Sequence, residues 1–125
     1  IWRHGQRAPS HINDVSGREV FHNGAGALTD MGIKRSMELG KFLRKRYIVE
    51  NQLLSRKMDE TEINFQSTNV TRCMETLKLV ARGMYGKDDD KKFIIPYKVN
   101  SQEDNLFGFA WFTCPALGKI FQSKC

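Results

Sequence analysis

The chain has 125 residues, 40% of them hydrophobic and 27% charged, with a formal net charge of +6 at pH 7. This length suffices for one domain, and the composition is globular rather than disordered. Apolar runs such as Phe93–Ile95 are too short to span a membrane, so we expect no stable membrane insertion in this region. The basic charge favours anionic partners, but no zinc-finger spacing or aromatic interleaving points to nucleic acid, and we expect none as a partner.

The first predicted element is a short extended piece that ends at Ile1–Trp2. The residues up to 26 are interpreted as a loop, because Asn23, Gly24 and Gly26 are typical of turns. The first residue is Ile rather than Met. We therefore expect the natural N-terminus, and any signal peptide with it, to lie outside this sequence.

A helix is predicted to start at Thr29 or Asp30, both good N-caps, and to run to about Asn51. Apolar or small residues recur along it at helical spacing: Ile33, Met37, Gly40, Leu43 and Tyr47. A basic cluster fills the positions between and beyond them, and we interpret it as a solvated face. It comprises Lys34, Arg35, Lys41, Arg44, Lys45, Arg46, Arg56 and Lys57.

A short strand is predicted at Ile63–Phe65, followed by several candidate N-caps and a second helix. The apolar stripe of this helix is the clearest in the chain and ends at Gly83 or Gly86. It consists of Val70, Met74, Leu77, Ala81 and Met84. Beyond it we expect a solvated loop over 87–92 and an extended piece at 93–95. The apolar stretch 106–112 shows no clear periodicity.

This alternation of strands and helices predicts an α/β fold with parallel strands. Ligands of open α/β sheets collect at the carboxyl ends of the strands. Two segments fall there, Arg3–Arg7 and Gln66–Thr68, and the second also opens a helix whose free amides suit an anion.

Arg3, His4 and Arg7 are the strongest candidates for functional residues in the sequence. Two guanidinium groups make a clamp for a phosphate or carboxylate. A neutral imidazole within that clamp can attack phosphorus and hold the phosphoryl group covalently. The alternative is a basic surface loop with an incidental histidine. The spacing of Arg, His, Gly, Arg and Pro argues against it, since such a pattern arises by chance on the order of once in ten thousand chains of this size. The chemistry needs no cofactor, and no cluster of metal ligands is visible in the sequence.

The pattern RHGxRxP at residues 3–9 resembles the signature of the histidine acid phosphatases, branch 2 of the histidine phosphatase superfamily. Residues 28–47 resemble the helix that follows the signature in prostatic and lysosomal-type acid phosphatases. The segment FQSTNVTR at 65–72 resembles the family's RSTDxxR, and CPAL at 114–117 resembles a later Asn-Cys-Pro stretch. The resemblance covers nearly the whole chain. It implies a phosphoglycerate mutase-like, three-layer α/β/α fold that is incomplete here.

Carried over by position, the resemblance implies that His4 is the phosphate-accepting nucleophile and that Arg3 and Arg7 bind phosphate. A further phosphate-binding arginine of the family falls on Gln66, which brings no charge. The family's general acid belongs to a His-Asp pair of its C-terminal half. The three histidines here, His4, His11 and His22, precede Gly, Ile and Asn, so the acid is not in this chain.

These departures predict that residues 1–125 are part of a histidine acid phosphatase domain whose C-terminal half is absent. The segment would comprise the signature loop, the following helix and a second strand–helix unit. The full-length parent would hydrolyse small phosphomonoesters at acidic pH, be secreted or lysosomal, and allow a homodimer, whereas the segment alone would be inactive. Cysteines occur at 73, 114 and 125, so at least one is free or pairs outside the chain. The resemblance makes Cys114 a disulfide candidate, and we expect Cys73 to be a buried thiol.

A second hypothesis follows from Gln66. Without a charged arginine at that position, the parent would be a catalytically weak or inactive secreted protein that binds phosphorylated ligands. A third, a basic nucleic-acid-binding domain, explains the charge but not the spacing of the residues in 3–9. A His-Asp or His-Glu dipeptide in the downstream sequence would favour the enzyme.

Overall fold

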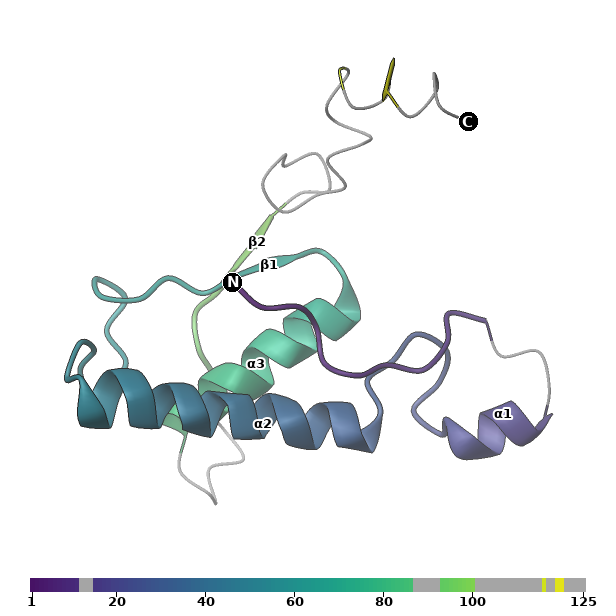
Figure 1. Ribbon diagram of the computed structural model, residues 1–125, viewed down its shortest axis with the longest axis horizontal. Helices are drawn as coiled ribbons and strands as arrows, with labels where there is room; N and C mark the ends of the chain where they lie inside the picture. Colours follow the sequence, from purple (N-terminus) through teal and green to yellow (C-terminus); the bar gives the residue numbers. More distant parts are fainter. Residues whose placement is uncertain (12–14, 87–92, 101–115, 117–118, 121–125) are drawn as a thin grey trace.

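The computed structural model describes residues 1–11, 15–86, 93–100, 116 and 119–120. Its elements in chain order are α1 (Val15–Val20), α2 (Asp30–Arg44), the π-helix η1 (Lys45–Glu50), β1 (Gln66–Thr68), α3 (Thr71–Tyr85) and β2 (Lys98–Asn100). In Figure 1, α2 and α3 cross, and β1 and β2 lie together close to the N-terminus.

The two strands form a parallel pair in which Gln66, Ser67 and Thr68 lie opposite Lys98, Val99 and Asn100. Helix α3 lies between them in the chain, which makes a strand–helix–strand unit. Parallel strands need such a crossover, because a tight turn can join only antiparallel neighbours. The α/β prediction is therefore confirmed at this level.

Helix α2 begins where the sequence predicted it. Thr29 is the N-cap, and its Oγ1 accepts the backbone N–H of Gly32 at 3.1 Å. The α-helix ends at Arg44, and η1 continues the helical path to Glu50, one residue before the predicted end. The predicted apolar stripe is wrong at Ile33, which is 38% exposed. The buried face instead carries the small residues Gly32, Ser36 and Gly40.

That small-residue face lets α2 and α3 approach closely. A Cβ built on Gly40 would overlap the backbone of Val80 and Gly83. Close helix crossings require small residues, because any side chain at the contact would hold the two backbones apart. The sequence predicted Gly40 on the contact face but gave no sign of its partner Gly83.

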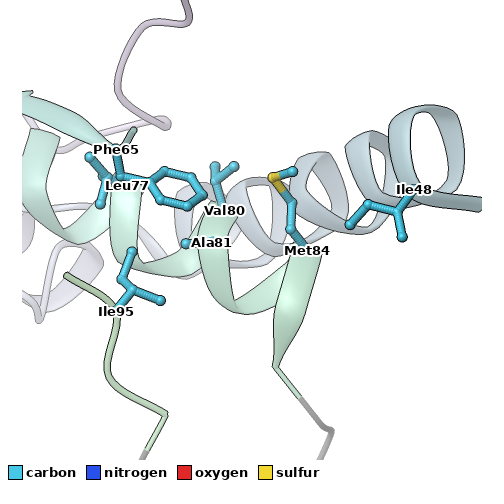
Figure 2. Close-up of a cluster of buried hydrophobic side chains, with 7 residues drawn as sticks. All are labelled: Ile48, Phe65, Leu77, Val80, Ala81, Met84 and Ile95. Carbon is cyan, nitrogen blue, oxygen red and sulfur yellow. The ribbon is translucent and has the colours of Figure 1, made fainter. Parts of the chain in front are cut away.

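Helix α3 carries the core, as its periodicity predicted. It runs to Tyr85, and Gly86 is its C-cap. A single cluster of buried side chains spans η1, α3 and the segments around the strands (Figure 2): Ile48, Phe65, Leu77, Val80, Ala81, Met84 and Ile95. The rings of Phe65 and Tyr85 meet edge to face, with centroids 6.5 Å apart. Burial of this apolar surface fixes β1 and η1 against α3.

Two predictions of secondary structure are wrong. Residues 63–65 form no strand, and the strand begins at Gln66, because the ladder exists only where β2 lies alongside. Residues 15–20 form helix α1 instead of loop. The extended piece predicted at 93–95 is assigned no helix or strand, and β2 follows Pro96 at 98–100.

The predicted extended end at Ile1–Trp2 is assigned no strand in the described structure. Most of the basic cluster is exposed, as predicted, but Arg44 is half-buried and donates to the carbonyl of Met84. The stretch 106–112 lies outside the described residues, and so does the predicted loop 87–92.

Candidate functional site

The signature loop (residues 3–9) lies along the segment that leads into α2. The N–H of Ala8 donates to Ala27 O at 2.8 Å, and the N–H of Thr29 donates to Gln6 O at 3.0 Å. Arg7 and Leu28 form an antiparallel bridge. Two positive φ angles, 95° at Gly24 and 70° at Gly26, turn the chain into this pairing, and glycine adopts them without steric cost. The start of α2 therefore fixes the loop.

Gly5 brings the loop into direct contact with α2. A Cβ on Gly5 would lie 2.7 Å from Ser36 Oγ and 2.9 Å from Gly32 O. A Cβ on Gly32 would in turn overlap the carbonyl of Gln6. The sequence predicted that Gly5 permits close approach. The structure identifies the backbone of α2 as what it approaches.

His4 is half-buried, and its Nδ1 lies 2.8 Å from the carbonyl oxygen of Gly5. A carbonyl oxygen can only accept, so this bond requires the proton of a neutral imidazole to be on Nδ1. Nε2 then keeps its lone pair. A neutral imidazole in this tautomer is suited to act as a nucleophile or base through Nε2.

A cavity of about 250 Å³ adjoins His4 and is lined by both parts of the predicted site. Gln66, half-buried, lines it together with His4, although 61 positions separate them in the sequence. Cys73 and Leu77 reach it from α3. Its full lining is Ile1, Trp2, His4, Asn64, Phe65, Gln66, Ser67, Thr68, Cys73, Thr76 and Leu77. The cavity thus brings His4 together with Gln66–Thr68, although Gln66–Thr68 is itself the strand and not, as predicted, the segment after it.

The two arginines do not line this cavity. Arg3 and Arg7 line a second, open concavity to which His4 also contributes. Arg3 is exposed, whereas Arg7 is half-buried and its Nη1 donates to Ala8 O at 2.8 Å and Ser10 Oγ at 3.1 Å. Within the described part of the chain both bonds use Nη1, and Nε and Nη2 together have the geometry of a bidentate contact with an anion. The structure thus places His4 at the boundary between an arginine-lined surface and the cavity of Gln66.

Cys73 is a free, half-buried thiol, less buried than predicted, because it faces the cavity. The disulfide candidate Cys114 lies outside the described residues. Within the described ranges, no three His, Cys, Asp or Glu side chains gather as a metal site would require. No helix in that part of the chain has the length and apolar character to cross a bilayer.

Shifted pKa values occur away from this site. Hydrogen bonds from the side chain and the backbone N–H of Thr61 lower the pKa of Asp59. Burial raises the pKa of Tyr85, with a further contribution from Glu62 and an opposing one from Arg44. Neither group lines the cavity of His4.

Thr76 is a buried residue of the site that the sequence did not single out. Thr76 is 2% exposed, lines the cavity and binds the backbone of the signature loop. Its sequence signal was a polar residue beside Leu77 on the buried side of an amphipathic helix. Such a residue requires a hydrogen-bond partner, but the sequence does not identify that partner.

Comparison with known proteins decides the family. The family description Histidine phosphatase superfamily (branch 2) matches residues 1–124. The chain belongs to this family. The histidine phosphatase match includes the signature loop, both long helices and both strands of the described structure.

Individual relatives carry acid phosphatase names. Putative acid phosphatase 1 of Caenorhabditis elegans is 36% identical over 86 residues, which cover 68% of this chain and 20% of the relative. Testicular acid phosphatase of Mus musculus is 32% identical over 135 residues, covering 99% of the chain and 31% of the relative. Lysosomal acid phosphatase of Xenopus laevis is 31% identical over 130 residues, covering 96% of the chain and 29% of the relative. The chain therefore spans between a fifth and a third of the length of these phosphatases.

Proposed function

We propose that this chain is the N-terminal part of a longer acid phosphatase that hydrolyses small phosphomonoesters through a phosphohistidine on His4. The observation that carries the proposal is the contact of His4 Nδ1 with Gly5 O, because it puts the proton of a neutral imidazole on Nδ1 and keeps the lone pair of Nε2 available, on a side chain that lines a cavity. The relatives' names support a phosphatase, and their length supports a longer protein.

In the first step, the lone pair of His4 Nε2 attacks phosphorus and forms an N–P bond. The P–O bond to the leaving group breaks, and the departing alkoxide takes a proton from a general acid outside this chain. In the second step, water attacks the phosphohistidine and gives a proton to the group that acted as acid in the first step; the N–P bond breaks, its electron pair returns to Nε2, and inorganic phosphate leaves. Arg3 and Arg7 would bind the phosphoryl oxygens and offset their charge in both transition states. No metal or cofactor is required for this sequence of steps.

The same proposal extends to the features that the family resemblance implies. The whole protein would adopt the three-layer, phosphoglycerate mutase-like arrangement, with β1 and β2 as part of its central sheet. It would be secreted or lysosomal, with Cys114 in a disulfide, and would allow a homodimer. As expected from the sequence, nucleic acid would not be a partner, and residues 1–125 alone would be inactive without the acid.

The test is to trap acid-labile phosphate on the whole protein and to compare His4→Ala with His22→Ala. His22 is exposed, and its Nε2 lies 3.4 Å from Asp30 Oδ2, outside the cavity of His4. We expect His4→Ala to abolish labelling and to lower turnover at least about a thousandfold, as loss of a catalytic nucleophile does. His22→Ala should label normally. Turnover and labelling that survive His4→Ala would refute the proposal.

A second candidate function is supported by Gln66. An uncharged amide lines the cavity beside His4 where the family pattern has arginine. Loss of one such group from the transition-state clamp weakens stabilisation by a few kcal/mol (~3) if nothing replaces it. The protein would then bind phosphorylated ligands and turn them over slowly or not at all.

Gln66→Arg separates the two candidates. If the missing charge limits a working enzyme, the arginine variant should raise kcat/KM by at least about tenfold. Gln66→Lys restores charge without the bidentate geometry and should give a smaller gain. If neither variant gains activity in the whole protein, Gln66 is not the limiting defect.

A further inference from the structure

The hydroxyl of Thr76 connects helix α3 to the signature loop. Its Oγ1 donates to Arg72 O at 2.7 Å, one turn earlier in the helix, and accepts the N–H of Gly5 at 3.0 Å. A threonine hydroxyl has a single proton, and the bond to Arg72 uses it. The oxygen is therefore held as an acceptor directed at Gly5.

Gly5 in turn holds the ring of His4. The carbonyl of Gly5 accepts from His4 Nδ1 at 2.8 Å. The N–H of Gly5 belongs to the His4–Gly5 peptide, and its C=O belongs to the Gly5–Gln6 peptide. Thr76 of α3 therefore holds the first of these units, and the imidazole of His4 is bonded to the second. A continuous path runs from Arg72 O through Thr76 and Gly5 to His4.

Helix α2 closes the opposite side of Gly5. Its Cα faces Ser36 and the carbonyl of Gly32, with too little room for a Cβ. Ser36 is itself buried and its hydroxyl donates to Gly32 O at 2.7 Å, so this wall is well fixed. A rotation that turned the Gly5 carbonyl away from His4 would break the bond to Thr76 or push the loop into α2.

We propose that Thr76 is a positioning residue for His4. By holding the His4–Gly5 peptide, it keeps the Gly5 carbonyl where it binds Nδ1–H and directs Nε2 into the cavity. The proposal rests on the proposed role of His4 as nucleophile. Misplacement of a reacting group by about 1 Å can cost about a hundredfold in rate, so the effect should fall on phosphoryl transfer rather than on substrate affinity.

The experiment uses the whole protein with Thr76→Val, which keeps the shape and removes the hydroxyl, and Thr76→Ser, which keeps the hydroxyl. Rapid-quench trapping with a radiolabelled aryl phosphate measures the rate at which the acid-labile label forms. Thr76→Val should lower this rate by about tenfold to a hundredfold and leave KM nearly unchanged. Thr76→Ser should retain most of the rate. If Thr76→Val does not fold, Thr76→Ala provides the same comparison.

Val80→Ala is the control for stability. Val80 is completely buried on the same helix and does not line the cavity of His4. The substitution Val80→Ala should destabilise the protein without slowing label formation in the folded molecules. Label formation at the wild-type rate in Thr76→Val, or an equal loss in Val80→Ala, would overturn the proposal.

Nitrogen NMR of the His4 ring separates this proposal from the proposed function. The wild type should show the Nδ1–H tautomer, and Thr76→Val should show a mixture of tautomers. If the wild type forms no label on His4, the phosphohistidine mechanism fails, and the NMR comparison still tests Thr76. A tautomer unchanged by Thr76→Val would then overturn the positioning role.

Discussion

The signature loop and the crossing of α2 with α3 are stabilised in different ways. The crossing buries a continuous apolar cluster and brings two glycines into backbone contact. The loop buries Ala8 and otherwise depends on a few hydrogen bonds to residues 26–29 and to Thr76. Apolar burial contributes most of the stability of such a unit, whereas a few directional bonds determine where a reactive side chain points.

This difference separates stability from activity. A substitution in the core should lower the free energy of unfolding and leave the chemistry of folded molecules intact. A substitution in the loop should reduce activity more than stability. The following predictions test that separation on the whole protein, in order of decreasing effect.

Met84→Ala should have the largest effect on stability. Met84 is 3% exposed within the core, and truncation of a buried methionine costs about 2–5 kcal/mol. Urea denaturation should show a loss of about 3 kcal/mol, with activity per folded molecule unchanged. Met31→Ala is the matched control, because Met31 is 48% exposed on α2 and should cost no more than about 0.5 kcal/mol. Equal losses in the two variants would contradict the assignment of the core.

Among substitutions outside the proposed nucleophile His4, Gly5→Ala should have a large effect on activity. The added methyl would meet Ser36 Oγ and Gly32 O and displace the loop from α2. We expect kcat to fall about a hundredfold, which corresponds to about 2.7 kcal/mol on the barrier. The loss of stability should be smaller than for Met84→Ala. Ser36→Ala in the same background removes one of the two obstacles and should recover part of the rate. A Gly5→Ala protein with normal kcat would show that the close approach is dispensable.

Thr29→Ala tests the junction between the two regions. Loss of the N-cap bond to Gly32 should cost about 1 kcal/mol of stability. The backbone N–H of Thr29 still binds Gln6 O, so the loop should stay in place and activity should change little. Thermal unfolding measures the effect on stability, and kcat measures the effect on activity. The separate variant Thr29→Ser keeps the capping hydroxyl and should be as stable as the wild type. A large loss of activity would mean that the cap, rather than the backbone, positions the loop.

Tyr85→Phe should have the smallest effect, visible as a change in pH dependence. Burial raises the pKa of Tyr85 above its ordinary value of 10.0, so the folded state holds this proton more tightly than the unfolded state. The resulting stabilisation is complete below pH 10 and is lost as the pH rises from there through the folded pKa. Above pH 10, the free energy of unfolding should therefore fall more steeply in the wild type than in Tyr85→Phe. Parallel curves would contradict the raised pKa.

The sequence predicted those parts of the fold that have a local cause. Thr29 and Gly86, each one of two predicted helix boundaries, agree with the structure, and so do Leu77, Ala81 and Met84 of the predicted stripe of α3. The position of β1 did not, because alternation over residues 63–65 fits a strand equally well and only β2 selects the paired residues. Ile33 was misplaced for a related reason. The helical period alone does not fix the edges of the buried face, and the contact with the signature loop buried Gly32 and Ser36 rather than Ile33.

The sequence by itself determined the reactive groups: a histidine flanked by arginines in the signature loop, and a glutamine where the family pattern has arginine. Tertiary structure alone decided how these groups meet. It brought Gln66 to the cavity of His4, placed Arg3 and Arg7 in a separate concavity that His4 also lines, and set Thr76 against Gly5. The physical reason is that side-chain chemistry is encoded at single positions. The distance between positions 5 and 76 depends instead on how two helices pack, and no local pattern carries that information.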